Sequence, residues 1–103
     1  MSQAFNVGKV GEFYSGVLRP VEIEGYSVAV VRLGDQFFAF SNYCPHMGAE
    51  LTGSMIDGKE IICWWHGSTF DLETGEVTMG PGTDPLRMYE VRIEDGNVIV
   101  VKG

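Results

Sequence analysis

The stretch CPHMGAEL, residues 44–51, places a cysteine and a histidine two positions apart, followed by a glycine. A second stretch, CWWHGSTF at residues 63–70, carries a cysteine and a histidine three positions apart. Together they contain both cysteines and both histidines of the chain, in the spacing C-x-H-x16-C-x2-H. Two loops that each offer one thiol and one imidazole indicate a single site built from both loops. The candidate ligands are Cys44, His46, Cys63 and His66.

Three interpretations fit this pattern poorly. Cysteines are often small buried hydrophobic residues, but that leaves the matching of the two pairs unexplained. A nucleophilic Cys–His pair would use one cysteine and one histidine and leave the other pair without a role. Structural zinc accepts two thiolates and two imidazoles, yet its sites usually pair cysteine with cysteine and histidine with histidine across a short spacing.

A [2Fe–2S] cluster with mixed ligands fits the pattern best. In such a cluster two cysteines hold one iron and two histidines hold the other. Two loops with one ligand of each kind can clasp the cluster from both sides. We therefore expect one [2Fe–2S] cluster, and a zinc-stabilised binding module stays as an alternative.

The composition restricts what this chain can bind. Its net charge of −7 argues against nucleic acid, whose protein partners carry basic patches, and against anionic membranes. Its longest apolar run, residues 61–65, is far shorter than the roughly 18 residues of a membrane helix. The N-terminus also lacks the design of a signal peptide. We expect a cytoplasmic protein, where reducing conditions disfavour a disulfide between Cys44 and Cys63.

Turn signals divide the chain into short apolar runs. Residues 28–33 and 36–40 flank Gly34-Asp35 and predict a β-hairpin. Further turns are predicted at Asp57-Gly58, at residues 73–75 and at Asp95-Gly96, and no window shows a helical period. The chain is expected to form one all-β antiparallel domain, residues 1–103, closing as a small sandwich or barrel. The reactive segment, at about residues 42–85, is expected to be a small subdomain inserted into it.

These residues resemble the Rieske family. The resemblance rests on CPHMG (44–48) and CWWHGS (63–68), and on Phe70-Asp71-Leu72, Thr74-Gly75, Gly80-Pro81-Gly82 and Pro85-Leu86. The last two motifs look like the family's proline loop, which covers the third side of the cluster, and the resemblance extends over essentially the whole chain. It implies a Rieske-type [2Fe–2S] cluster in a cluster-binding subdomain. It also implies that Cys44 and Cys63 hold the inner iron, while His46 and His66 hold the outer iron near the surface.

Within the family, the chain is most similar to the soluble ferredoxin component of bacterial ring-hydroxylating dioxygenase systems. We expect a Rieske domain alone, without an oxygenase domain, a membrane anchor or an export signal. High-potential relatives carry a disulfide under the cluster, and the matching positions here are Ala49 and Trp65. Those relatives also place a serine and a tyrosine as donors to the cluster sulfurs. Ser68 fills the serine position, but Phe70 replaces the tyrosine, so we expect a potential toward the negative end of the roughly −150 to +300 mV Rieske range.

The resemblance implies an electron carrier and not an enzyme. Single electrons would pass from a flavin-dependent reductase to a terminal, aromatic-ring-hydroxylating oxygenase. We expect the histidine edge to be the electron port, with Met47 and Trp65 as an apolar docking rim and the acidic surface steering toward a basic partner. The alternative within the family is the small Rieske subunit of a nitrite-reductase-type enzyme.

Overall fold

The computed structural model describes residues 3–45, 48–64, 67–80 and 84–102. These residues form ten strands and one short 3-10 helix, in the order β1 (Gln3–Lys9), η1 (Val10–Glu12), β2 (Leu18–Ile23), β3 (Tyr26–Leu33), β4 (Gln36–Ser41), β5 (Met55–Asp57), β6 (Glu60–Ile62), β7 (Thr69–Asp71), β8 (Val77–Met79), β9 (Met88–Glu94) and β10 (Asn97–Lys102). The paired strands are antiparallel throughout. The predicted all-β antiparallel fold is confirmed. No helix in these described ranges has the length and apolar character needed to cross a bilayer.

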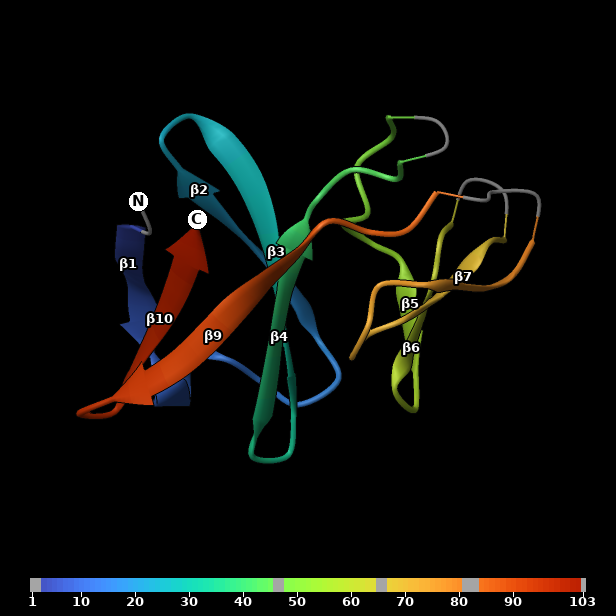
Figure 1. The fold of residues 1–103 in the computed structure, drawn as a ribbon. Coiled ribbons are helices and arrows are strands. Elements are labelled where there is room, and N and C mark those ends of the chain that lie inside the picture. The colour runs from blue at the N-terminus through green and yellow to red at the C-terminus, as the bar shows by residue number, and fades with distance from the viewer. Residues whose placement is uncertain (1–2, 46–47, 65–66, 81–83, 103) are drawn as a thin grey trace.

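The strands form two sheets, shown side by side in Figure 1. The large sheet has the order β1-β10-β9-β4-β3-β2, and the small sheet has the order β5-β6-β7-β8. The chain leaves the large sheet after β4, builds the small sheet, and returns as β9, which pairs with β4. Residues 42–85, here called the inserted segment, therefore lie between two neighbouring strands of the large sheet. In Figure 1 the small sheet lies at the end of the molecule opposite both chain termini.

One hydrophobic core lies on a single face of the large sheet. Its buried members are Phe13, Ile23, Val28, Val30, Ala39, Val98 and Val100. Partly buried side chains from β1 and β9, such as Phe5 and Val91, pack against them. Because all six strands contribute to this one cluster, the large sheet curls around it in the barrel-like manner expected from the sequence.

A second core fills the space between the two sheets. It is reached from the opposite face of β3 and β4, where Ala29, Val31 and Phe40 are fully buried. The small sheet contributes Ile61 and Phe70 to the same cluster. Successive residues of a strand point to opposite faces, so β3 is buried on both faces at its centre. This explains the unbroken apolar run over residues 28–31, which is typical of a strand covered on both sides.

The predicted hairpins are confirmed, whereas the first two strands were not predicted. At Asp95-Gly96 both residues have positive φ, +53° and +76°, which is the backbone of a type I′ turn. In β2, Pro20 has no amide hydrogen, and β2 lies at an edge of the large sheet, where proline is tolerated. In β1, the pairing with β10 shifts register between Asn6 and Gly8, so an alternating pattern is interrupted there.

Candidate metal centre

Both cysteines lie in the core between the two sheets. Cys44 follows β4 by three residues, and Cys63 directly follows β6. Their exposed fractions are 2% and 1%, and both belong to the cluster that contains Leu51 and Phe70. Two strands that are distant in sequence therefore deliver both thiols to one apolar region. The structure thus brings together the two cysteines that are predicted to hold the inner iron.

The two loops that begin at these cysteines close with the same pair of backbone hydrogen bonds. In the first loop, the Gly48 amide donates to the Cys44 carbonyl (2.7 Å), and the Cys44 amide donates to the Ala49 carbonyl (2.7 Å). In the second, the Gly67 amide donates to the Cys63 carbonyl (2.9 Å), and the Cys63 amide donates to the Ser68 carbonyl (2.8 Å). The described parts of the loops are therefore structural counterparts.

A glycine four residues after each cysteine makes this closure possible. Gly48 has φ +72° and Gly67 has φ +75°, in the left-handed region that side-chain-bearing residues avoid. Both loops carry the pattern C-x3-G in the sequence. It is the sequence signal for their matched geometry, since the histidines stand at different offsets from the two cysteines.

Trp64 connects the second loop to the first. Its indole Nε1 donates to the Glu50 carbonyl (2.7 Å), and its amide donates to Ser54 Oγ (3.3 Å). The side chain is 52% exposed, so it spans the two loops on the outside of the molecule. The sequence reasoning selected Met47 and Trp65 instead, and both lie outside the described residues. The sequence does not distinguish Trp64 from its neighbour Trp65, because both side chains carry an indole N–H group.

Replacing Trp64 with phenylalanine should loosen this connection while keeping an aromatic ring. The Glu50 carbonyl loses its indole donor, so we expect a loss of about 1 kcal/mol in the free energy of unfolding. The cluster should also be released faster in denaturant. Urea unfolding followed by circular dichroism, with iron release followed by absorbance, measures both effects. A variant as stable as the parent and with unchanged iron release would show that the contact does not hold the loops together.

Asn42 fixes the start of the first loop to the large sheet. Its amide donates to the Ser27 carbonyl (3.1 Å), and its Nδ2 donates to Ser27 Oγ (3.0 Å) and to Thr52 Oγ1 (2.8 Å). The Leu51 amide returns to the Asn42 carbonyl (2.9 Å). Asn42 is buried, so these bonds are shielded from water. The first loop is thus tied at both of its ends to one residue beside β3.

Gly80 brings a third segment against the second loop. A Cβ atom at this position would lie 2.5 Å from the Ser68 Cα and 2.8 Å from the Ser68 Oγ, so only glycine allows the backbone so close. Ser68 is itself buried. The approach agrees with a covering segment that begins at Gly80, although Pro81 and Gly82 lie outside the described residues. That Ser68 donates to a cluster sulfur stays a prediction.

The two histidines, His46 and His66, lie outside the described residues. The described flanks place each of them within a loop closed by the bonds above, two or three residues after a buried cysteine. Two thiols in one apolar core can be held there as thiolates when a metal centre offsets their charge. The donor set therefore fits a [2Fe–2S] cluster with thiolates on one iron and imidazoles on the other.

Comparison with known families defines the class of protein. The model of the Rieske [2Fe–2S] domain matches residues 3–90. Fold, loops and donor set agree with this match, and the chain belongs to the Rieske [2Fe–2S] domain family.

Similar proteins include ferredoxins of dioxygenase systems. The chain is 40% identical to ferredoxin CarAc of Metapseudomonas resinovorans over 86 residues, which cover 82% of this chain and 80% of that one. It is 34% identical over 91 residues to human apoptosis-inducing factor 3, covering 88% of this chain but 15% of that protein. Among solved structures, the complex of reduced oxygenase and oxidized ferredoxin in carbazole 1,9a-dioxygenase contains a chain that superimposes with a TM-score of 0.89 at 36% identity, covering 94% of this chain and 91% of that one.

Proposed function

We propose that this chain is an electron carrier that passes single electrons from a flavin-dependent reductase to a terminal, aromatic-ring-hydroxylating oxygenase. The observation that carries the proposal is the pair of matched loops, which place Cys44 and Cys63 in one core. The family match supports the Rieske cluster, and the likeness to a ferredoxin seen in complex with an oxygenase supports the terminal partner. The chain would serve as a component of a multicomponent oxidoreductase in the cytoplasm and would not be an enzyme by itself.

The proposed ligands are Cys44 and Cys63 for the inner iron, with His46 and His66 for the outer iron. When bound, the cluster supplies one-electron chemistry. The apolar residues around the cysteines, including Leu51 and Phe70, exclude water from the thiol side. The backbone hydrogen bonds at Cys44 and Cys63 fix the described ends of the two loops, which limits rearrangement there when the charge changes. We propose residues 1–103 as a single Rieske domain, with residues 42–85 as its cluster-binding part.

Metal analysis of anaerobically purified protein tests the proposal. The expected result is two irons and two labile sulfides per chain, with no zinc, and an EPR signal after reduction by dithionite. One zinc without sulfide would overturn the electron-transfer function in favour of a zinc-stabilised module. Mixing the oxidised protein with NADH and a flavin reductase should then bleach the visible spectrum. A protein that is reduced by dithionite but never by a reductase would instead fit a fixed subunit, such as that of a nitrite-reductase-type enzyme.

The proposed low potential depends partly on Phe70. Its ring is fully buried in the core that contains both cysteines, and it has no O–H group to donate. Phe70→Tyr adds a donor, so we expect the potential to rise because hydrogen bonds to the sulfurs favour the reduced cluster. An optical redox titration measures the change, with Phe38→Tyr on β4 as the aromatic control. A parent potential above about +200 mV, near the top of the Rieske range, would contradict the low-potential assignment.

A further inference from the structure

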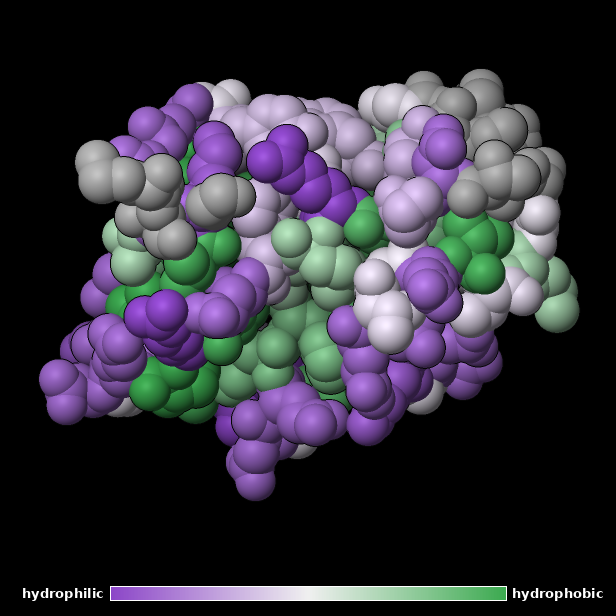
Figure 2. Space-filling model, viewed as in Figure 1, coloured by the Kyte–Doolittle hydropathy of each residue, from purple (hydrophilic) through white to green (hydrophobic). Residues whose placement is uncertain are grey.

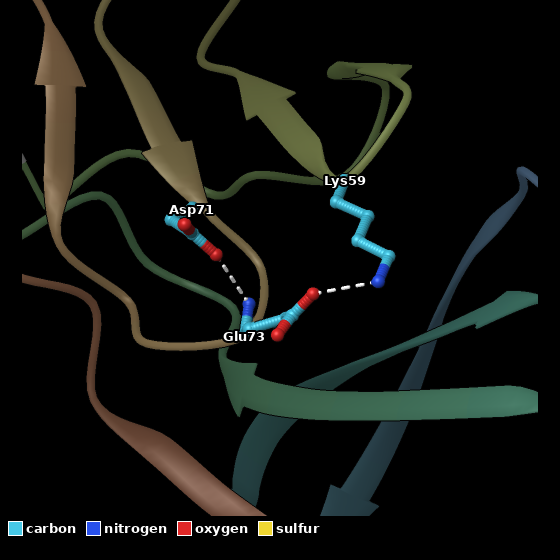
Figure 3. A network of polar contacts seen from close by, with 3 residues as sticks. All are labelled: Lys59, Asp71 and Glu73. Atoms are coloured by element: carbon cyan, nitrogen blue, oxygen red, sulfur yellow. Dashed lines mark hydrogen bonds and ion pairs between the residues drawn. The ribbon is translucent and has the colours of Figure 1, made fainter.

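The negative charge of this protein is concentrated in the inserted segment. Residues 42–85 contain seven acidic residues and one basic residue, Lys59, giving a net charge of −6. The remainder contains seven acidic and six basic residues, giving −1. Lys59 is itself paired with Glu73 at 2.7 Å, as Figure 3 shows. The other six carboxylates of the inserted segment therefore have no cation of the same segment to neutralise them.

The register of the small sheet sorts its side chains into rows. The inward row is formed by Ile56, Ile61, Phe70 and Val77, all packed in the core between the sheets. Two rows lie on the outer face. The apolar row runs in regular register across three strands as Met55, Ile62 and Thr69. Met79 of β8 ends the row and pairs with Thr69 at a register shift, where the Thr69 and Thr78 hydroxyls also share a hydrogen bond (2.5 Å). The carboxylate row runs across three strands as Asp57, Glu60 and Asp71.

The apolar row lies directly beside the second cysteine loop. Ile62 immediately precedes Cys63, and Thr69 immediately follows Ser68. The two methionines at the ends of the row are 67% and 70% exposed. Single exposed apolar residues are common, but here they belong to paired strands of one sheet that leads into the loop of the half-exposed Trp64. In Figure 2, apolar and hydrophilic surface lie side by side at the end of the molecule that carries the small sheet.

The carboxylate row works against the stability of the sheet. Asp57 faces Glu60, and Glu60 faces Asp71, so like charges are direct cross-strand neighbours on one face. Asp71 Oδ1 accepts the Glu73 amide at 2.7 Å (Figure 3), but the ion pairs among the described residues include none of the three. The row stands two residues, or about 7 Å, from the apolar row. A cationic partner would offset this repulsion.

We propose that the outer face of the small sheet is the docking surface for the electron-accepting oxygenase. The proposal rests on the proposed function. The oxygenase would offer an apolar centre to the Met55–Met79 row and lysine or arginine side chains to the carboxylate row. A second copy of this chain is disfavoured as the occupant, because it would bring a segment of −6 against another of −6. Docking here places the acceptor beside the second cysteine loop.

Two variants and two matched controls test this surface. The carboxylate-row variant is Asp57→Asn, Glu60→Gln and Asp71→Asn, and the last of these changes keeps a side-chain oxygen for the Glu73 amide. Its control is Glu22→Gln, Asp35→Asn and Glu94→Gln, which removes the same charge from the exposed surface of the rest of the chain. The apolar-row variant is Met55→Ser with Met79→Ser. Its control is Tyr14→Ser with Ile93→Ser, also at exposed positions. Matched iron content and circular dichroism are required for all four.

The measured quantity is the second-order rate constant for oxidation of the reduced protein by the oxygenase of carbazole 1,9a-dioxygenase. We expect the carboxylate-row variant to be slower by about tenfold at low salt, with a weaker salt dependence, and the apolar-row variant to be slower by several-fold. The controls should stay within about twofold of the parent. Equal rates for variants and parent, equal losses in the controls, or a loss confined to reduction by the flavin reductase would each overturn the proposal. A salt-sensitive dimer that disappears in the carboxylate-row variant would assign the face to self-association instead.

The same design separates this proposal from the proposed function. If the parent protein carries a reducible cluster but does not reduce this oxygenase, the oxygenase of carbazole 1,9a-dioxygenase is not its electron acceptor. Cytochrome c, a basic electron acceptor, then tests the surface chemistry directly. If the variants reduce cytochrome c more slowly than the controls do, the outer face of the small sheet remains a docking site for a basic acceptor. If variants and controls reduce cytochrome c at equal rates, this face is not a docking site.

Discussion

Replacing Cys63 with serine is expected to give a protein without visible colour and with almost no iron or labile sulfide. The side chain of Cys63 is buried at the start of the second loop, within the apolar core. A thiolate is the ligand that an iron–sulfur cluster requires. A serine hydroxyl in this water-free region does not ionise readily, and its oxygen is a harder ligand than the thiolate sulfur. Iron and sulfide analysis, with the visible spectrum, measures the loss directly.

The control for this substitution adds a hydroxyl to the first loop without removing a thiol. Ala49→Ser serves, because Ala49 contributes its backbone carbonyl to the loop and not its side chain. This variant should keep the iron and sulfide of the parent. Circular dichroism of Cys63→Ser separates loss of the cluster from loss of the fold. Two irons and two sulfides retained in a folded Cys63→Ser protein would remove Cys63 from the ligand set.

Gly80→Ala should be among the most damaging substitutions at a position without a ligand. Its φ of +111° is strained for alanine, which costs about 1–2 kcal/mol. The new Cβ would also lie 2.5 Å from the Ser68 Cα, and this backbone atom cannot move aside as a flexible side chain would. Overpacking of this kind adds about 1–3 kcal/mol. We expect the melting temperature of the holo protein to fall by about 10 °C or more, with faster loss of the cluster.

Gly53→Ala is the matched control for Gly80. Gly53 also lies in the inserted segment and has a φ of +93°, but nothing lies within 4 Å of a Cβ placed there. In this variant the free energy of unfolding should therefore fall only by the cost of a positive φ at alanine, about 1–2 kcal/mol. The variant should retain its cluster as the parent does. Similar losses in both variants would mean that the contact between Gly80 and Ser68 has no special role.

The hairpins could be predicted from the sequence because their turns are encoded locally. The turns at Gly34-Asp35, Asp57-Gly58 and Asp95-Gly96 need residues that adopt positive φ or form tight turns, and these are present in the sequence. The first two strands were missed for equally local reasons. Pro20 and Gly8 are poor strand residues. Pro20 is tolerated because β2 is an edge strand, and Gly8 because the register shifts there. Both features are properties of the assembled sheet.

The candidate site could be predicted only as far as its ligand types. The two cysteines and two histidines were recognisable from spacing, and the structure places both cysteines in one core. The contact between Trp64 and the Glu50 carbonyl joins residues that are fourteen positions apart, and the approach of Gly80 to Ser68 joins residues in different loops. Contacts of this kind depend on how the loops are placed in three dimensions, so no local pattern in the sequence announces them.

The strands β3 and β4 limit how freely this protein can be divided. Val28 and Val30 belong to one core, while Ala29 and Val31 belong to the other. The two cores therefore share the strands β3 and β4. Heat or denaturant should then remove both cores in one transition. For the same reason, the inserted segment cannot be transferred to another protein by itself. A protein engineer who moves residues 42–85 to another scaffold would also have to supply a strand pair that is apolar on both faces.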